Sequence, residues 1–387
     1  MIRVVGARLA GMLLLCLLAV PVLASPLDDA RARVIESFTQ KARIPVDKAL
    51  IEGPWETVPF NQDRFTYSFA EIRQRWPEFM RGLRIPYPSP EYLKDRYNRF
   101  PDMMRDLGYQ DADWQQHSLN VLEVWQAFFR GDFRKARDLG IKYGGYAQVP
   151  GVFSQILHAI YLAETHEKKQ MLLQDAIDRI EYYGKATPFL PHQDEFHQDY
   201  VIFRLGLAYA VGRLAEDEPV PVMLANGYAP LVVNAGTEAQ AVDPDHPVVR
   251  ALNAVFDANV IRRVGKAAGK WTLGAEQGNA IDLLGQSLEK VDDVAITQYE
   301  YANSLLYMKD VAAIDETLVH LEKAAQLPSR FAMEELDALY AQKRLREVQA
   351  LKAQGGGFSG FDRARRKHMK QTGVNLYCVA CPPFLIN

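Results

Sequence analysis

A repeated apolar pattern between residues 116 and 353 limits most strongly how this chain can fold. Apolar side chains recur there at spacings of three and four, as Val121, Trp125 and Phe128 do. Breaks such as Gly131 interrupt them about every 15 to 20 residues. This spacing predicts amphipathic α-helices, and consecutive helices with short breaks are typical of an α-solenoid. We therefore expect an all-α fold with about five helix pairs over residues 116–353.

Residues 1–24 have the pattern of a secretory signal peptide. Arg3 and Arg8 precede an apolar run of about 15 residues, which ends at Ala24 before the polar Ser25. We expect cleavage there and a periplasmic or secreted protein. Removing the two arginines reduces Lys+Arg from 45 to 43 against 48 Asp+Glu, so the net charge becomes −5. A chain without a basic excess does not favour nucleic acid as a partner.

Residues 25–115 interleave prolines with aromatic side chains. The prolines between Pro45 and Pro101 keep every helix in this segment short. Aromatic side chains such as Trp55 and Trp76 must be buried if the segment is to fold. We expect an arm packed across the helical repeats, either as a cap over the first repeat or as a lid that contacts a ligand.

Two short segments resemble the tetratricopeptide repeat (TPR). Residues 130–136 are similar to the turn and the start of the second helix of that repeat. Residues 205–209 are similar to the Leu-Gly-x-x-Tyr element of its first helix. In such a repeat, Ala136 and Gly206 would occupy small-residue positions at which paired helices pack closely. The resemblance implies a TPR-like α-solenoid.

The end of the repeat region, residues 292–351, resembles the last repeats of the periplasmic T-component family associated with TRAP transporters. The resemblance rests on Tyr299-Glu-Tyr-Ala302, on Pro328 and on residues 339–345. The chain lacks the lipobox of that family, and it has an added aromatic arm and an extra tail. The resemblance implies a non-enzymatic accessory that binds a small or apolar ligand and works with a transporter protein.

The tail, residues 354–387, contains Cys378 and Cys381, the two cysteines that remain when residues 1–24 are removed. An oxidising compartment favours a disulfide between them, and thiol redox chemistry or metal binding are the alternatives. The tail also contains a basic cluster, which is either a solvated helical face or a surface for a membrane or an acidic partner. This cluster consists of Arg363, Arg365, Arg366, Lys367 and Lys370.

Other chemical motifs are weak. Metal-ligating side chains gather between His192 and His197, but two histidines five residues apart diverge around a helix. Acidic residues in the first turns of a helix explain this segment without a metal. The glycine-containing segments 265–270 and 357–361 depart from the phosphate-loop and nucleophile-elbow patterns. We therefore predict no catalytic residue, no metal and no cofactor.

Tyr209, Tyr299 and Tyr301 are the candidate ligand-contacting residues. They fall on predicted first helices, which line the concave face in repeats of this type. Tyrosine combines an apolar ring with a polar tip, which suits a mostly apolar ligand with one polar group. Packing between repeats is the alternative role for all three side chains.

Three functions are consistent with these patterns. The first is a periplasmic binding protein or transport accessory that holds a small or apolar ligand. The second is a TPR scaffold for the assembly of envelope proteins. The third is a thiol redox or metal-dependent protein that uses Cys378 and Cys381. An enclosed apolar pocket would favour the first function, an open polar groove the second and an exposed reactive thiol the third.

Overall fold

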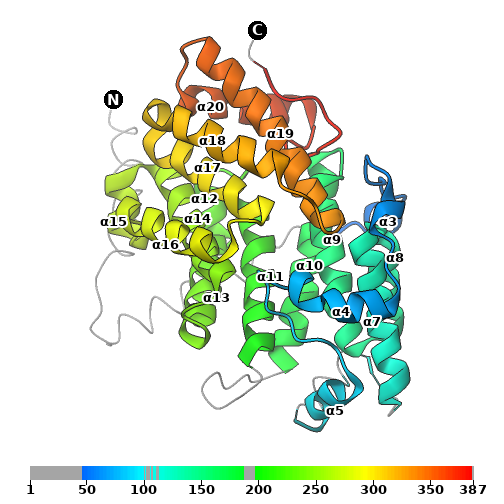
Figure 1. The fold of residues 1–387 in the computed structure, drawn as a ribbon. Coiled ribbons are helices and arrows are strands. Elements are labelled where there is room, and N and C mark those ends of the chain that lie inside the picture. Colours follow the sequence, from blue (N-terminus) through cyan, green and yellow to red (C-terminus); the bar gives the residue numbers. More distant parts are fainter. Residues whose placement is uncertain are drawn as a thin grey trace, which may run out of the picture.

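The regular elements of the computed structural model are helices (Figure 1). The structure describes residues 46–99, 101, 105, 108–109, 113–186 and 197–385. Within them, the extended pairing is limited to an isolated bridge between Thr165 and Val374. The predicted all-α class is therefore confirmed. The predicted signal peptide lies outside the described residues.

The helices are grouped, in chain order, as arm, repeat region and tail; α7 begins at Trp114, two residues before the predicted start of the repeat region. The arm contains α3 (Lys48–Glu52), η1 (Gln62–Phe65), α4 (Phe69–Phe79) and α5 (Pro90–Arg99). The repeat region contains α7 (Trp114–Arg130), α8 (Phe133–Tyr143), η2 (Gly145–Ala147), α9 (Gln148–Tyr161), α10 (His166–Ala186), α11 (His197–Ala215), α12 (Val220–Ala225), α13 (Tyr228–Val242), α14 (Pro247–Val264), α15 (Lys266–Leu273), α16 (Gln277–Val291), α17 (Ala295–Lys309), η3 (Asp310–Ala313), α18 (Ile314–Gln326) and α19 (Ala332–Ala353). The tail begins with α20 (Phe358–Thr372).

Two sets of helix contacts organise the repeat region. Consecutive helices pack on each other, as α7 does on α8 and α17 on α18. In addition, α7 contacts α9, α9 contacts α11, α11 contacts α14, α14 contacts α17 and α17 contacts α19. This second set joins helices that are not consecutive in the sequence, and the predicted α-solenoid of about five helix pairs stays a prediction. We call the helices α7, α9, α11, α14, α17 and α19 the inner helices.

The last inner helix returns to the first two, so that the two ends of the array meet. Figure 1 shows α19 reaching towards α9, and α19 contacts both α7 and α9. Just before α19, the ring of Phe331 lies 5.3 Å from that of Phe129 on α7. The hydroxyl group of Tyr161, at the end of α9, donates a hydrogen bond of 2.7 Å to Asp337 on α19. Side chains of the inner helices therefore contact one another across the interior.

The arm covers this meeting point. Trp76 of α4 is buried and makes an edge contact with Trp125 of α7 at 5.4 Å. The ring of Phe79 contacts both Phe129, at 4.6 Å, and Phe331, at 5.9 Å. The arm therefore packs on both ends of the helical array, where Trp76 and Phe79 are buried, whereas other aromatic side chains of the arm, such as Trp55 and Tyr67, are half-buried.

The tail joins the same two ends from another side. Asn375 is fully buried, and its side-chain amide donates hydrogen bonds to the carbonyl oxygens of Ile160 at 2.9 Å and Ala163 at 2.7 Å. These carbonyl groups lie at the C-terminal end of α9, where a helix lacks its own donors. Lys343 of α19 donates to the carbonyl oxygen of Cys378 at 2.7 Å. The tail is thus part of the folded core.

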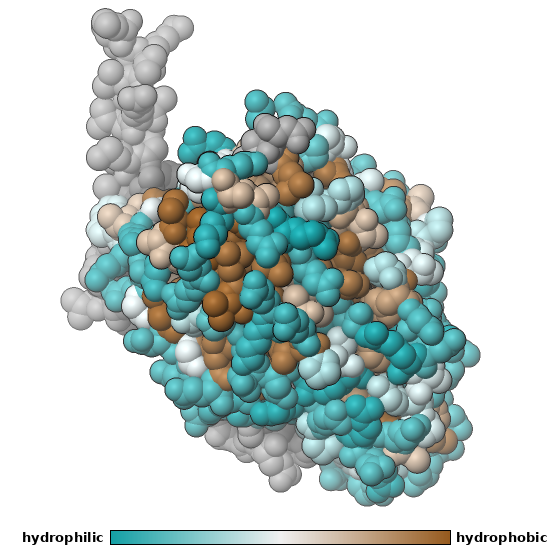
Figure 2. Space-filling model, turned by 45° about the horizontal axis from the view of Figure 1, so that its top comes forward, coloured by the Kyte–Doolittle hydropathy of each residue, from teal (hydrophilic) through white to brown (hydrophobic). Residues whose placement is uncertain are grey.

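The face drawn in Figure 2 mixes hydrophilic side chains with separate apolar areas. No helix among the described residues is both long enough and apolar enough to cross a bilayer.

Gly140 and Gly206 offer a matched test of close helix packing. A Cβ atom at Gly140 would lie 2.8 Å from the backbone oxygen of Ala147, whereas at Gly206 the nearest atom would be 3.6 Å away. We expect Gly140→Ala to lower the free energy of unfolding by about 1–3 kcal/mol. Gly206→Ala should preserve or raise it, because alanine favours the helix by up to about 1 kcal/mol. Denaturant unfolding of both variants measures this difference, and equal effects would contradict the packing.

Candidate functional site

The predicted ligand-contacting tyrosines do not lie together. Tyr299 is 1% exposed, and its ring lies 5.0 Å from that of Tyr340. Tyr209 packs under the guanidinium group of Arg213 at 5.1 Å. Tyr301 projects from another side of α17 and contacts His320 at 4.5 Å. The structure therefore places Tyr209 and Tyr299 in the interior and Tyr301 nearer the surface.

The interior that holds Tyr209 and Tyr299 is lined by charged side chains. Arg213 forms ion pairs with Glu300 and with Glu216. Lys169 forms an ion pair with Asp217 at 2.8 Å. Buried charges are unfavourable unless they are paired, so these pairs fix the relative positions of α10, α11 and α17. We call the whole buried set the interior network; its members are Tyr161, Lys169, Tyr209, Arg213, Glu216, Asp217, Tyr299, Glu300, Asp337, Tyr340, Arg344, Glu347, Arg365 and Tyr377.

Arg365 of the predicted basic cluster belongs to this network. Its side chain is 1% exposed and donates to the hydroxyl group of Tyr340 at 3.3 Å. Arg344 pairs with Glu347 at 2.9 Å, and Glu347 also accepts a hydrogen bond from the backbone of Phe384 at 3.0 Å. The interior network therefore connects α19 and α20 with the end of the tail.

The pKa of Asp337, whose carboxyl group faces α9, is shifted upward. Burial raises the pKa of Asp337 to about 7, although the hydrogen bond from Tyr161 acts in the opposite direction. Burial also raises the pKa of Glu300. Glu334 and Glu300 contribute to the high pKa of Asp337, whereas Arg213 lowers it. Near neutral pH, part of the population therefore carries a neutral Asp337.

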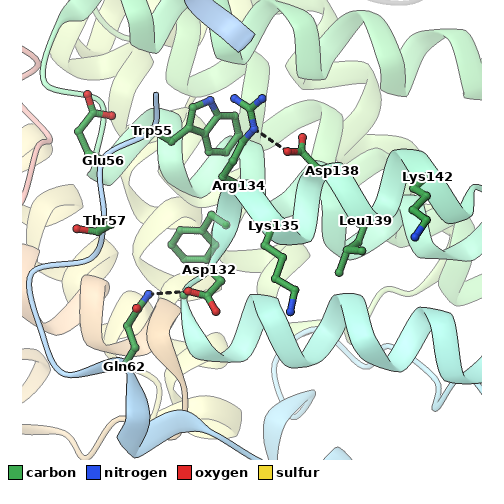
Figure 3. A pocket seen from close by; sticks show the side chains of 12 residues that line it. Trp55, Glu56, Thr57, Gln62, Asp132, Arg134, Lys135, Asp138, Leu139 and Lys142 are labelled. Carbon is green, nitrogen blue, oxygen red and sulfur yellow. Dashed lines mark hydrogen bonds and ion pairs between the residues drawn. The ribbon is translucent and has the colours of Figure 1, made fainter. Parts of the chain in front are cut away.

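An open groove lies between the arm and α8 (Figure 3). It has a volume of about 650 Å³, and residues 55–57 of the arm form one wall. Lys135, Leu139 and Lys142 follow one another along the opposite wall, at positions i, i+4 and i+7 of α8. Residues with this spacing share one face of a helix. The sequence analysis did not identify this stripe, because a helical face with two lysines is usually only a solvated surface.

The turn at the base of the groove requires glycine. Gly131 ends α7 with a φ of 90°, which is in the left-handed region. A Cβ atom there would lie 2.9 Å from the Cβ of Ala332 on α19 and 3.1 Å from Val58 of the arm. The following residue, Asp132, accepts a hydrogen bond from Gln62 at 3.1 Å. Close packing of the arm, α7 and α19 therefore sets the shape of this end of the groove.

Arg134 fixes the arm to α8. Its guanidinium group donates to the carbonyl oxygens of Ile51 at 3.2 Å and Gly53 at 3.0 Å. It also pairs with Asp138 at 2.8 Å, as Figure 3 shows, and with Glu52 at 2.9 Å. The groove is therefore preformed, because its two walls are tied by several hydrogen bonds.

The remaining charges of the groove are not equivalent. Burial opposes ionisation of Glu56, but hydrogen bonds from His158 and Lys168 lower its pKa to about 2. Glu56 is therefore an ion-paired carboxylate. Lys135 and Lys142 are exposed, and neither forms an ion pair with any residue that the structure describes. The other charged residues of the lining, Asp132, Arg134 and Asp138, are also ion-paired, so the charges without an ion pair in the groove are those of the two lysines.

Cys378 and Cys381 of the tail lie close together in space. Their Cα atoms are 5.3 Å apart, and this spacing suits a disulfide. The disulfide itself stays a prediction. Cys378 is fully buried, so the structure does not present its sulfur to solvent.

The described residues contain no group of three or more histidine, cysteine, aspartate or glutamate side chains that could hold a metal ion. The segment that begins at His192 lies outside the described residues, and of His197 only the backbone is described. No family model, curated protein or solved structure matches this chain. The resemblance to the tetratricopeptide repeat and to the T-component family stays a hypothesis.

Asp337→Asn tests the effect of the buried carboxyl group. Because its pKa is about 7 in the folded state and about 3.9 in an unfolded chain, its contribution to stability is complete below about pH 4 and is lost as the pH rises to about 7. Asparagine has a similar size and stays neutral. We therefore compare the unfolding free energy of the variant with that of the wild-type protein at each pH. This difference should shift in favour of the variant by roughly 2–4 kcal/mol between pH 4 and pH 8. Denaturant titrations across this range measure it; a constant difference would contradict the raised pKa.

Proposed function

We propose that this chain is a non-enzymatic scaffold of the cell envelope, and that the groove between the arm and α8 binds an acidic segment of a partner protein. The observation that carries this proposal is the stripe of Lys135, Leu139 and Lys142 along one wall of the groove. Carboxylate groups of a partner would pair with the two lysines, and an apolar side chain would pack on Leu139.

The form of the groove supports a polypeptide as the ligand. It is open to solvent, and six of the twelve residues that line it have charged side chains. Trp55 adds an aromatic contact, and its ring is held in place by stacking on His158 at 4.3 Å. Preformed walls reduce the entropy that a partner must lose on binding, which favours recognition of a short segment.

The form of the groove and the burial of Cys378 favour this function over the two alternatives. A small or apolar ligand would be expected to occupy an enclosed apolar pocket, whereas this groove is open and has charged side chains among its apolar ones. Thiol chemistry would require accessible cysteines, whereas Cys378 is buried and Cys381 is half-buried. The location in the envelope rests on the signal-peptide pattern of residues 1–24.

A photo-crosslinking residue at Leu139 tests the proposal in cells that produce the protein in their envelope. We expect a discrete adduct at Leu139 and none at Val319, an apolar position on α18 that is 64% exposed. Charge reversal at Lys135 and Lys142 should reduce the adduct roughly tenfold, because two exposed ion pairs contribute up to about 1 kcal/mol each.

The matched control reverses Lys48 and Lys94, which are also exposed and lie outside the groove. This double variant should retain the adduct. The proposal would be wrong if Leu139 and Val319 gave the same products, or if the adduct survived charge reversal in the groove.

A further inference from the structure

Two buried arginines share one carboxylate where α19 meets α20. Nη1 of Arg344 on α19 donates to Oε2 of Glu347 at 2.9 Å, and Nε of Arg365 on α20 lies 3.9 Å from the same oxygen. The other carboxylate oxygen of Glu347 accepts the backbone N–H of Phe384 at 3.0 Å. The side chains of Arg344, Glu347 and Arg365 are each at most 2% exposed. Two buried cations therefore have one carboxylate between them.

A second carboxylate is shared in the same way. Asp362 of α20 pairs with Arg366 at 3.1 Å and with Arg262 of α14 at 3.4 Å. Burial opposes ionisation of Asp362, but Arg262, Arg366, Arg365 and Arg344 all lower its pKa, so all four guanidinium groups lie within electrostatic reach of it. We call these four arginines, together with Glu347 and Asp362, the arginine cluster. The side chain of Arg366 is 28% exposed, so the cluster reaches the surface at this end.

The remaining buried carboxyl groups of the interior network are engaged by partners outside the arginine cluster. These pairings are Glu216 and Glu300 with Arg213, Asp217 with Lys169, and Asp337 with Tyr161. Within the cluster, four guanidinium groups thus face two carboxylates. Buried charge is unfavourable unless it is compensated, so this excess of positive charge favours a further anion.

Arg344 also has donors without an acceptor. Its Nε and Nη2 are buried and form no hydrogen bond with the described residues, and the same holds for Nε of Arg365. Nε and Nη2 lie along one edge of the planar guanidinium group, and such an edge fits two oxygens of a carboxylate, phosphate or sulfate group. Burial alone would lower the pKa of Arg344, but Tyr299 and Glu347 raise it, so the group keeps its charge.

We propose that the arginine cluster binds a small oxyanion, with two of its oxygens accepting hydrogen bonds from Nε and Nη2 of Arg344. The oxyanion supplies both the missing acceptors and the missing negative charge, whereas a water molecule would supply only the acceptors. Inorganic phosphate, sulfate and a small carboxylate share this chemistry. This inference does not depend on the groove, because the cluster uses other residues on other helices.

Unfolding measurements with inorganic phosphate test the proposal, with chloride as the comparison at equal ionic strength. We expect phosphate to raise the unfolding free energy along a saturating curve, because a ligand that binds only the folded state stabilises it. Sulfate and acetate, titrated in the same way, identify which oxyanion the cluster prefers.

An oxyanion that is already bound would hide this response, so the anions that the purified protein holds are counted as well. The protein is dialysed against chloride and unfolded in acid, and ion chromatography identifies the phosphate, sulfate and carboxylates that it releases. Release of about one oxyanion per chain supports the proposal. The proposal is overturned if the protein releases no oxyanion and is stabilised by phosphate, sulfate and acetate no more than by chloride.

Arg344→Lys keeps a positive charge but removes the edge with two donors. We expect it to weaken oxyanion binding by roughly 10- to 100-fold, because a charge-assisted hydrogen bond is lost. The matched control is Arg137→Lys, since Arg137 is also buried but donates to protein side chains from Nε, Nη1 and Nη2. The control should bind the oxyanion as the wild-type protein does, and equal binding by the two variants would contradict the site.

Arg366→Gln offers a milder change at the more exposed end of the cluster. It removes one positive charge beside Asp362 and should weaken oxyanion binding by roughly two- to fivefold. Unchanged oxyanion binding in both Arg366→Gln and Arg344→Lys would show that the oxyanion lies elsewhere and would overturn the proposal.

Discussion

The contact between α19 and the first inner helices is the constraint on which the rest of this structure depends. Phe331 packs on Phe129, and Tyr161 donates a hydrogen bond to Asp337, so residues about 170 to 200 positions apart in the sequence meet. Once the ends meet, charged side chains of the inner helices are enclosed and must pair with one another. The interior network is a consequence of this closure.

The meeting of the two ends of the helical array also determines which surfaces are left for a partner. The interior holds Tyr209 and Tyr299, but their surroundings are buried groups of the protein itself. The open groove at the arm and the exposed faces of α15 and α20 lie outside this interior. The groove therefore uses an outer surface, and the tail contributes to both surface and interior, since α20 presents Arg363 outward and Arg365 inward.

The sequence predicted the local structure well and the long-range structure poorly. Helical periodicity reports which face of a helix is buried, so it identified the helices. It does not indicate which other helix that face packs against. The sequence therefore assigned Arg365 to a surface cluster and grouped Tyr301 with Tyr299. It also marked Gly206 as a close-packing position, whereas the closer approach is at Gly140.

A double-mutant cycle between Phe129 and Phe331 tests closure most directly. The account predicts that Phe129→Leu and Phe331→Leu are coupled in unfolding free energy by about 0.5–1.5 kcal/mol, because the rings are in contact in the folded state. Phe358, which is buried on α20, supplies a control pair with Phe129 whose effects should add within about 0.5 kcal/mol. Additive effects for Phe129 and Phe331 as well would contradict the closed array.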